Sequence, residues 1–328
     1  MTAAGSILDV IGRTPAVWLD RMTAARGLNG RILAKLDYLN PGFSKKDRAA
    51  LGIIRMARAD GSLHPGQGVV ELTSGNMGTG LAIVCRQLGH PFVAVMSRGN
   101  SPERAAMMAA LGAEVVLVDQ APGSRAGEVS GADLALVEAE AQRLTAERSA
   151  FRADQFNHPG NARAHADTTG PELWADSGGS LTAFVDFAGS GGSYAGVIQA
   201  LKRENPALRG YVLEPEGAAA LSGAPVRDPA HPIQGGGYAM ADLSLLAGAP
   251  VDGYLTVTGD EARSTARALA VEEGIFADEN LSVEMTWTKG GAETLQAVTT
   301  QSVDMGFVNG MLGVLGAYQR GAPVRIVG

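Results

Sequence analysis

Two adjacent lysines, Lys45 and Lys46, follow a turn-forming stretch at residues 40–44 that reads Asn-Pro-Gly-Phe-Ser. A lysine amine can form a Schiff base with a carbonyl compound when it is partly desolvated and held against the carbonyl carbon. On its own, a Lys-Lys-Asp-Arg run is more typical of a solvated helix start. The lysine pair is therefore a candidate nucleophile only if other segments provide a site for its partner.

A second segment, residues 73–78, reads Thr-Ser-Gly-Asn-Met-Gly and lies between a predicted strand and a predicted helix. The backbone N–H groups of such a turn and the hydroxyls of Thr73 and Ser74 can hold an anion, such as the carboxylate of an amino acid, with help from the helix dipole. A plain strand-to-helix turn has the same composition. The segment is therefore compatible with a carboxylate site without requiring one.

A third segment, Gly189 to Ser193, reads Gly-Ser-Gly-Gly-Ser and also lies between strand and helix. Glycines allow backbone amides to converge on a phosphate without obstruction from Cβ atoms, and the two hydroxyls add donors. The segment lacks the lysine of a P-loop and the spacing of a dinucleotide fingerprint. It therefore favours a smaller phosphate ester.

The elements that position these segments alternate between strand and helix. We expect strands at residues 69–72, 92–96, 115–118, 184–187 and 211–213, and helices at 79–88, 102–111, 133–148, 194–203 and 261–273. Ser101 is expected to cap the second of these helices, with Pro102 in its first turn. The alternation predicts an α/β fold with two βα subdomains, twisted and mostly parallel sheets, and a ligand cleft between them beside the carboxyl ends of the strands.

The composition excludes several classes of function. A net charge of -7 without a basic run gives no electrostatic footprint for nucleic acid. No stretch approaches the ~20 apolar residues of a membrane span, and we expect a cytoplasmic protein. The single cysteine, Cys85, is expected to be a buried small hydrophobe on a helix. The five histidines show no metal-ligand spacing, so no metal site is predicted.

Taken together, these segments resemble the cysteine synthase and cystathionine β-synthase branch of the fold type II, or tryptophan-synthase-β-like, enzymes that depend on pyridoxal 5'-phosphate. The resemblance runs from about residue 7 to residue 277. Besides the three segments above, it includes the runs at 11–15, 155–161, 168–172 and 233–237. Several segments that match the family in the same order along the chain identify it far more specifically than any one motif does.

The resemblance implies roles for individual residues. Lys46 carries the cofactor as a Schiff base and later moves protons, whereas Lys45 is a bystander. The cofactor is further held by Asn76 at its 3'-oxygen, by Gly189, Ser190, Gly191, Gly192 and Ser193 at its phosphate, and by Gly236 beside its ring. The substrate is held by Thr73, Ser74, Gly75, Met77 and Gln155.

The resemblance also implies two domains and a homodimer. Residues 1–43 and 151–328 form a larger cofactor-binding domain, and residues 44–150 form a smaller domain on the substrate side. Relatives that make cysteine commonly have glycine at the position of Phe43 and threonine at that of Met77. Both replacements add apolar bulk near the predicted substrate carboxylate and leave the substrate open.

The C-terminal segment departs further from the family. The family has a serine-rich turn after residue 277, one serine of which binds the pyridine nitrogen, whereas this chain continues differently. Ser282 is the nearest candidate for that contact, and Asp278 is a chemically different one. From about residue 281 the chain resembles a fragment of a periplasmic solute-binding protein, although its pattern is still compatible with completing the sheet.

These observations favour β-replacement on a small amino acid, with an O-activated serine and sulfide giving cysteine. A cysteine desulfhydrase or another β-eliminating lyase is the alternative within the same chemistry. A catalytically impaired protein that only binds pyridoxal phosphate or an amino acid is the alternative of another class, because the C-terminal segment is replaced.

Overall fold

The computed structural model describes residues 3–73, 75–124, 129, 131–229, 231–233 and 235–275. The chain divides into two units, Met1–Leu281 and Ser282–Gly328, and the described residues all belong to the first. The expectations for Ser74, Asp278, Ser282 and the tail therefore lie outside the described residues. No helix among these residues is long and apolar enough to cross a membrane.

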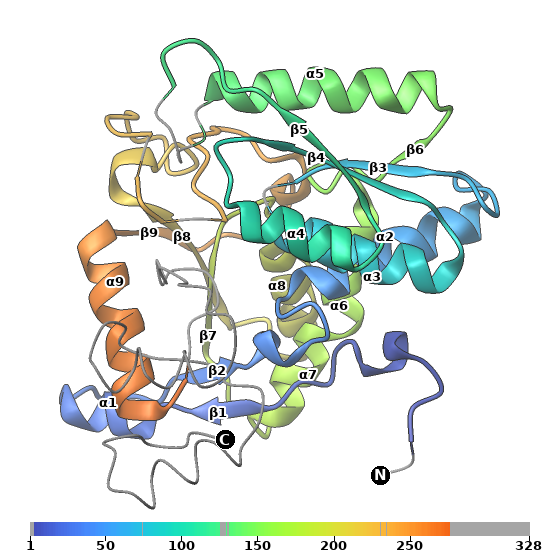
Figure 1. Ribbon diagram of the computed structural model, residues 1–328. Coiled ribbons are helices and arrows are strands. Elements are labelled where there is room, and N and C mark those ends of the chain that lie inside the picture. The colour runs from blue at the N-terminus through green and yellow to red at the C-terminus, as the bar shows by residue number, and fades with distance from the viewer. Residues whose placement is uncertain are drawn as a thin grey trace, which may run out of the picture. The chain divides into compact units, whose positions relative to one another are not determined.

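The described strands form three sheets (Figure 1). The strands are β1 (Ala16–Trp18), β2 (Leu33–Lys35), β3 (Val69–Leu72), β4 (Phe92–Ser97), β5 (Glu114–Val118), β6 (Phe151–Arg152), β7 (Ala183–Phe187), β8 (Arg209–Pro215) and β9 (Gly253–Val257). The helices are α1 (Asp20–Ala25), α2 (Lys46–Asp60), α3 (Asn76–Leu88), α4 (Pro102–Ala110), α5 (Gly131–Glu147), α6 (Pro159–Asp167), α7 (Thr169–Asp176), α8 (Gly192–Glu204) and α9 (Gly259–Ala268), which a π-helical turn, Leu269–Glu273, extends. Short 3-10 turns cover Ile7–Val10, Asp37–Leu39, Glu216–Ala218 and Ser244–Leu246.

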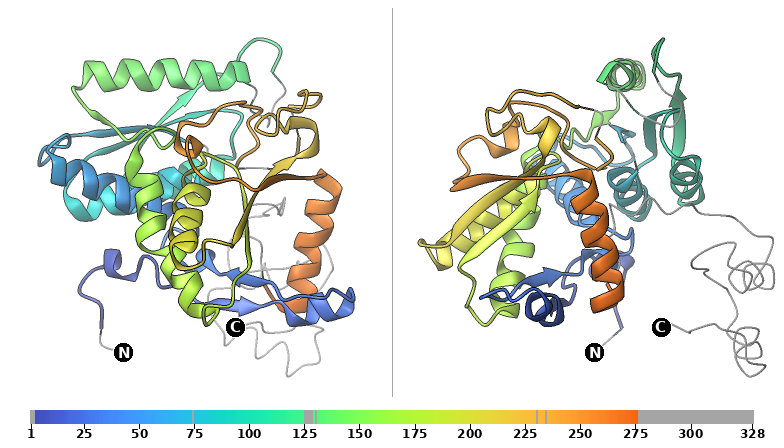
Figure 2. Two further views of the ribbon diagram at one scale, coloured as in Figure 1. Left: turned by 180° about the vertical axis from the view of Figure 1, so that it is seen from behind. Right: turned by 90° about the vertical axis from the view of Figure 1, so that its left-hand side faces the viewer.

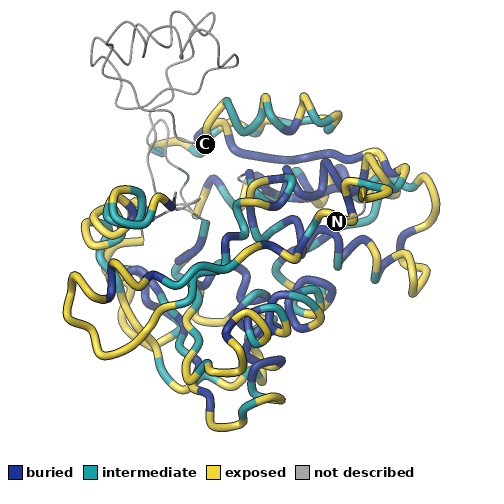
Figure 3. The backbone as a smooth tube through the Cα atoms, turned by 90° about the horizontal axis from the view of Figure 1, so that it is seen from below, coloured by how far each residue is buried: buried dark blue, intermediate teal, exposed yellow. Residues whose placement is uncertain are grey.

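Strands β5, β4, β3 and β6 form a parallel sheet in that order. In Figure 1, α5 lies on one side of this sheet, and α2, α3 and α4 lie on the other. Successive side chains of a strand point to opposite faces, so Val69 joins the core with α2 and α3, whereas Val70 joins the core with α5. All six residues of β4 are buried, and the buried and exposed stretches of the backbone can be followed in Figure 3. The helices that connect parallel strands cover both faces of the sheet, which is why the central strand β4 is buried and nearly all apolar.

Strands β7, β8 and β9 form a second parallel sheet. Figure 2 shows this sheet with the antiparallel pair of β1 and β2 and with α9 nearby. Phe184 and Val212 pack with Tyr194 of α8 in one core. Val185, which alternates with Phe184, is 48% exposed. A parallel sheet is usually covered on both faces, and the expectation that the tail completes this sheet concerns residues outside those described.

Helices α2, α6 and α8 pack closely because glycines stand at their crossings. A Cβ atom at Gly52 of α2 would lie 2.4 Å from the carbonyl oxygen of Gly160 in α6. One at Gly196 of α8 would lie 2.1 Å from the carbonyl oxygen of Ala162. Such distances exclude any side chain, so the backbones are in contact. These crossings place the first turns of the three helices in one region.

The predicted α/β fold is confirmed, and two local expectations need correction. Helices α3 and α8 begin at Asn76 and Gly192, inside the glycine-containing segments that we expected to be loops. Ser101 precedes α4, but its side chain caps no helix N–H and instead donates to the carboxylate of Glu103.

Candidate active site

Lys46 is the first residue of α2, and the preceding turn is held by its neighbours. The Ser44 hydroxyl accepts the Lys46 backbone N–H at 3.2 Å, and the buried carboxylate of Asp47 accepts the N–H of Gly42. Phe43 has a φ of 65°, in the left-handed region that favours glycine, and its side chain is 59% exposed. The local sequence therefore fixes the backbone at Lys46 at the cost of strain at Phe43.

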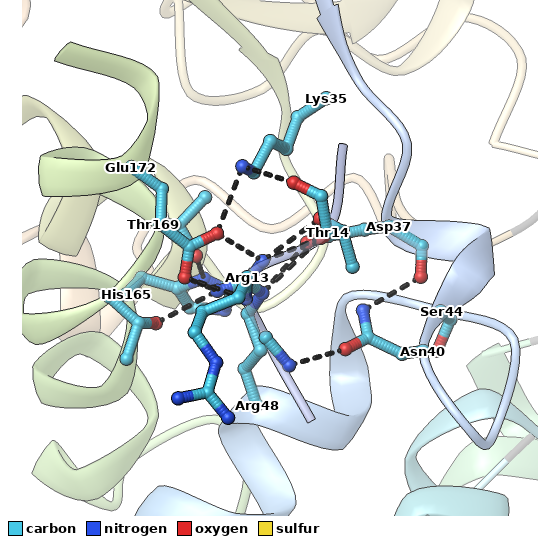
Figure 4. A network of polar contacts seen from close by, with 12 residues as sticks. Arg13, Thr14, Lys35, Asp37, Asn40, Ser44, Arg48, His165, Thr169 and Glu172 are labelled. Carbon is cyan, nitrogen blue, oxygen red and sulfur yellow. Dashed lines mark hydrogen bonds and ion pairs between the residues drawn. The ribbon is translucent and has the colours of Figure 1, made fainter. Parts of the chain in front are cut away.

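Arg48, one helical turn into α2, anchors this helix to the rest of the domain (Figure 4). Its side chain is 1% exposed and forms ion pairs with Asp37 at 2.8 Å and with Glu172 of α7 at 2.7 Å. Glu172 also pairs with Lys35 of β2 at 2.9 Å. Burial alone would raise the pKa of Glu172, but hydrogen bonds from Arg48, the Arg13 backbone and Lys35 lower it to about 2. The network holds the start of α2 to β2 and α7.

The segment after β3 is organised by Thr73. Its hydroxyl oxygen accepts the N–H groups of Gly75 at 3.1 Å and of Gly78 at 2.9 Å, so it caps the start of α3. The hydrogen of the Thr73 hydroxyl can still be donated to an acceptor such as a carboxylate. Gly75 has a φ of 149°, which only glycine adopts readily. Met77 is 2% exposed and belongs to the core, and Asn76 is the first helical residue.

Gln155 lies beside the same strand end. Its amide nitrogen donates to the carbonyl of Leu72 at 3.2 Å and, with a longer bond of 3.4 Å, to Glu71. Two acceptors therefore hold this amide nitrogen, and the bond to Glu71 is the longer of the two. Complete burial raises the pKa of Glu71 to about 7.

The Gly189–Ser193 segment presents unused backbone donors. Gly191 has a φ of 81° immediately before α8, and Ser190, Gly191 and Gly192 are buried. Within the described residues, no hydrogen bond uses the N–H groups of residues 190–193. Buried N–H groups at a helix start are costly unless an anion or water accepts them. The segment therefore fits a phosphate.

Contacts between side chains and backbones bring the three segments together. A Cβ atom at Gly80 of α3 would lie 3.2 Å from the Cα atom of Asp47, next to Lys46. Lys45 pairs with Asp186 of β7 at 2.8 Å, and the Ser193 hydroxyl donates to the same carboxylate. The starts of α2, α3 and α8 therefore meet around one site.

The other sequence-predicted regions lie next to the segment Gly189–Ser193. The amide nitrogen of Asn161 donates to the Ser190 hydroxyl at 2.9 Å and to the Gln155 carbonyl at 2.8 Å. A Cβ atom at Gly236 would lie 2.4 Å from the carbonyl oxygen of Ala188, so Gly236 directly abuts the residue before Gly189. The structure thus places Gln155 and Gly236 with the segments that the sequence singled out.

Several residues of this site were not predicted to matter. The pairing of Lys45 with Asp186 joins segments 141 residues apart, so the sequence around either residue does not indicate it. The network of Arg48, Asp37 and Glu172 had no local signal, since its members are far apart in the sequence. Cys85, as predicted, is a buried helical residue, and burial raises the pKa of its thiol to about 12.

A cavity of about 400 Å³ lies elsewhere, at the amino ends of β3 and β4. Its lining includes Val69, Arg86, His90 and Phe92 and none of the predicted site residues. Ligands of parallel α/β sheets bind beside the carboxyl ends of the strands. We therefore assign the active site to the convergent helix starts and not to this cavity.

Comparison with known protein families gives two matches. Residues 7–283 match the family described as pyridoxal-phosphate dependent enzyme. Residues 262–328 match a family described as NMT1/THI5 like. The first match includes all the described candidate site residues. The second match includes the C-terminal segment, which departs from the pattern of the family in the sequence analysis.

Individual relatives agree with the first match. The chain is 39% identical over 279 residues to the O-ureido-L-serine synthase of Streptomyces lavendulae, covering 84% of this chain and 81% of that protein. It is 38% identical over 274 residues to a cysteine synthase of Staphylococcus aureus, covering 83% of each. A solved structure of a hydrogen sulfide-producing enzyme from Fusobacterium nucleatum superposes with a TM-score of 0.74 at 31% identity, over 83% of this chain and 87% of that one.

Proposed function

Because the chain belongs to the family of pyridoxal-phosphate dependent enzymes, we propose that it catalyses β-replacement on an O-activated serine. The observation that supports this proposal is that Lys46, the turn at Thr73 and the segment Gly189–Ser193 lie together at the starts of three helices. The named activities of its relatives, a cysteine synthase and an O-ureido-L-serine synthase, both attach a nucleophile to the β-carbon of such a serine.

We place the cofactor by the chemistry of the available groups. Residues 189–193 would bind the phosphate through their unused N–H groups. Lys46 would hold the aldehyde carbon, Asn76 the 3'-oxygen, and Gly236 would leave room for the ring. When bound, pyridoxal phosphate supplies a ring system that withdraws electrons from the substrate Cα.

The protein residues would then bind and orient the substrate. Thr73 would donate its hydroxyl hydrogen to the substrate carboxylate, with Ser74, Gly75, Met77 and Gln155 completing that pocket. The amine of Lys46 would take the proton from Cα and later return it. Loss of the O-linked group from Cβ and addition of the nucleophile there complete the replacement. Met77 is buried in the hydrophobic core, and Phe43 lies exposed at the turn before Lys46.

The acceptor is tested by supplying different nucleophiles. O-acetylserine and O-phosphoserine would each be incubated with sulfide or hydroxyurea, because addition of hydroxyurea to Cβ would yield O-ureidoserine. We expect cysteine from sulfide. Consumption of O-activated serine with no nucleophile-dependent product would contradict β-replacement.

A second candidate is β-elimination from cysteine, supported by the likeness to a hydrogen sulfide-producing enzyme. Release of sulfide and pyruvate from cysteine alone would favour it. The homodimer, the cytoplasmic location and the two domains inferred from the sequence also remain proposals. Light scattering of the purified chain would test the dimer.

A further inference from the structure

Asp186 is shared by the lysine segment and the phosphate-binding segment. Its Oδ1 atom pairs with the ammonium of Lys45 at 2.8 Å, and its other oxygen accepts the hydroxyl of Ser193. The two charged side chains are largely enclosed, with 25% of Lys45 and 16% of Asp186 exposed. A carboxylate therefore stands directly behind the segment that we assign to the cofactor phosphate.

A carboxylate in this position has two unfavourable effects on phosphate binding. It carries a negative charge beside a group that is itself negatively charged, in a region where water screens the repulsion only partly. It also takes the single hydroxyl hydrogen of Ser193, which can then no longer be donated to the phosphate. Asp186 would weaken cofactor binding unless another group offsets its charge.

Lys45 is the group that offsets it. Its ammonium has three donors and holds Asp186 at a strong, charge-assisted distance. With the charge of Asp186 offset in this way, the carboxylate repels a bound phosphate less, although it still accepts the hydroxyl of Ser193. Lys45 is also adjacent to Lys46, so the same ion pair ties the residue that holds the aldehyde to the segment that holds the phosphate.

We propose that Lys45 is a positioning residue for the cofactor phosphate, acting by neutralising Asp186. The inference rests on the proposed phosphate site and is independent of which substrate reacts. Lys45 would not hold the aldehyde itself. Its role is electrostatic: the positive charge of Lys45 reduces the repulsion between Asp186 and a phosphate bound by residues 189–193.

A double-mutant cycle on the apoprotein tests this inference. The dissociation constant for pyridoxal phosphate is measured by titration for the unaltered chain, Lys45→Met, Asp186→Asn and the double variant. We expect Lys45→Met to weaken binding roughly tenfold or more, because it leaves an unpaired carboxylate. Asp186→Asn should bind within about threefold of the unaltered chain, and adding it to Lys45→Met should restore most of the affinity.

Two further variants separate this role from a general loss of structure. Lys45→Arg keeps the charge and should bind nearly as well as the unaltered chain. Lys202→Met removes the pair of Lys202 with Asp252, which is 3.0 Å long and of similar enclosure but lies at the other end of α8, and should leave binding unchanged. The phosphorus-31 resonance of the bound cofactor should shift in Lys45→Met and stay unchanged in Lys45→Arg and Lys202→Met.

The outcomes are distinct. Equal affinity for Lys45→Met and the unaltered chain would overturn the inference, as would failure of Asp186→Asn to rescue Lys45→Met. If the unaltered chain binds no pyridoxal phosphate, the phosphate site itself is wrong. If binding follows the cycle but no β-replacement occurs, the inference holds and the proposed reaction fails.

Discussion

Arg48 and Glu172 form a two-pronged ion pair, with nitrogen-to-oxygen distances of 2.7 and 2.8 Å, between the helix that begins at Lys46 and helix α7. Arg48 lies two residues after the proposed cofactor lysine, and its guanidinium is enclosed by Asp37 on its other side. The lysine is thus positioned by a buried network that reaches elements distant in the sequence.

Replacing Arg48 with methionine should destabilise the chain by roughly 3–5 kcal/mol, because it leaves buried carboxylates without their partner. The matched control is Arg163→Met, which breaks an exposed pair with Asp167 on α6 and should change the stability little, because water screens such a pair. Urea unfolding measures both. Similar losses for the two variants would mean that the Arg48 network does not anchor α2.

Asp47 should make stability fall as the pH rises. Burial raises the pKa of its carboxyl to about 7 from a usual value of 3.8, so between these values the folded chain holds a proton that the unfolded chain has lost. Each such group lowers the unfolding free energy by about 1.4 kcal/mol per pH unit in this window. Asp47→Asn should therefore flatten the profile between pH 5 and pH 7, as measured by urea unfolding.

Glu71 is also buried, with a pKa raised to about 7. In the Asp47→Asn variant the unfolding free energy should therefore still fall with rising pH, but less steeply. Glu172 has a lowered pKa and contributes only at lower pH, where its stabilisation is lost as it becomes protonated. An unchanged profile in Asp47→Asn would show that this carboxyl is ionised throughout.

Replacing Gly191 with valine should strongly reduce retention of pyridoxal phosphate. A Cβ atom there would lie 2.6 Å from Leu246, and the φ of 81° disfavours any side chain. Gly123→Val is a matched control, since Gly123 has a φ of 90° and an added Cβ atom there would meet no atom of the described residues within 4 Å. Absorbance after gel filtration gives the cofactor content, and equal content in both variants would argue against the proposed phosphate site.

The altered C-terminal segment should separate cofactor attachment from turnover. The groups proposed to hold the cofactor precede residue 277, whereas the pyridine contact of the family falls after it, where Ser282 and Asp278 are the candidates. Losing one neutral hydrogen bond costs ~1 kcal/mol, and a displaced ring could cost 10²-fold in rate. We expect a coloured protein with low kcat, and a family-type turn grafted after Ala277 should raise it. Full turnover in the unaltered chain would refute this expectation.

Strong periodic signals explain how much of the fold could be predicted. The expected strand at 69–72 matches β3, and the strand at 184–187 matches β7 to within one residue. Short apolar runs that end at glycine-containing turns are typical of strands. Helix starts were placed too late, at 79 instead of Asn76 and at 194 instead of Gly192. Glycine lowers helix propensity, and only tertiary packing extends those helices into the turns.

The site was predictable where its residues are contiguous and hidden where they are not. The Thr73 and Gly191 segments carry their own turn chemistry, so they could be recognised locally. The role of Asp186 depends on the approach of Lys45 from a segment 141 residues away, and the pairing of Arg48 with Glu172 spans 124 residues. No local pattern encodes such contacts.

The central claim is that Lys46 holds pyridoxal phosphate, and it is tested by reducing the protein with borohydride and mapping the labelled peptide. Lys46→Ala should abolish the absorbance near ~410 nm, whereas Lys45→Ala, saturated with cofactor, should keep it. Lys45 precedes α2, and its ammonium is paired with Asp186 at 2.8 Å, whereas Lys46 is the first helical residue. We therefore expect only Lys46 to reach the cofactor aldehyde. A pyridoxyl group on Lys46 is the predicted result, and one on Lys45 would contradict the account.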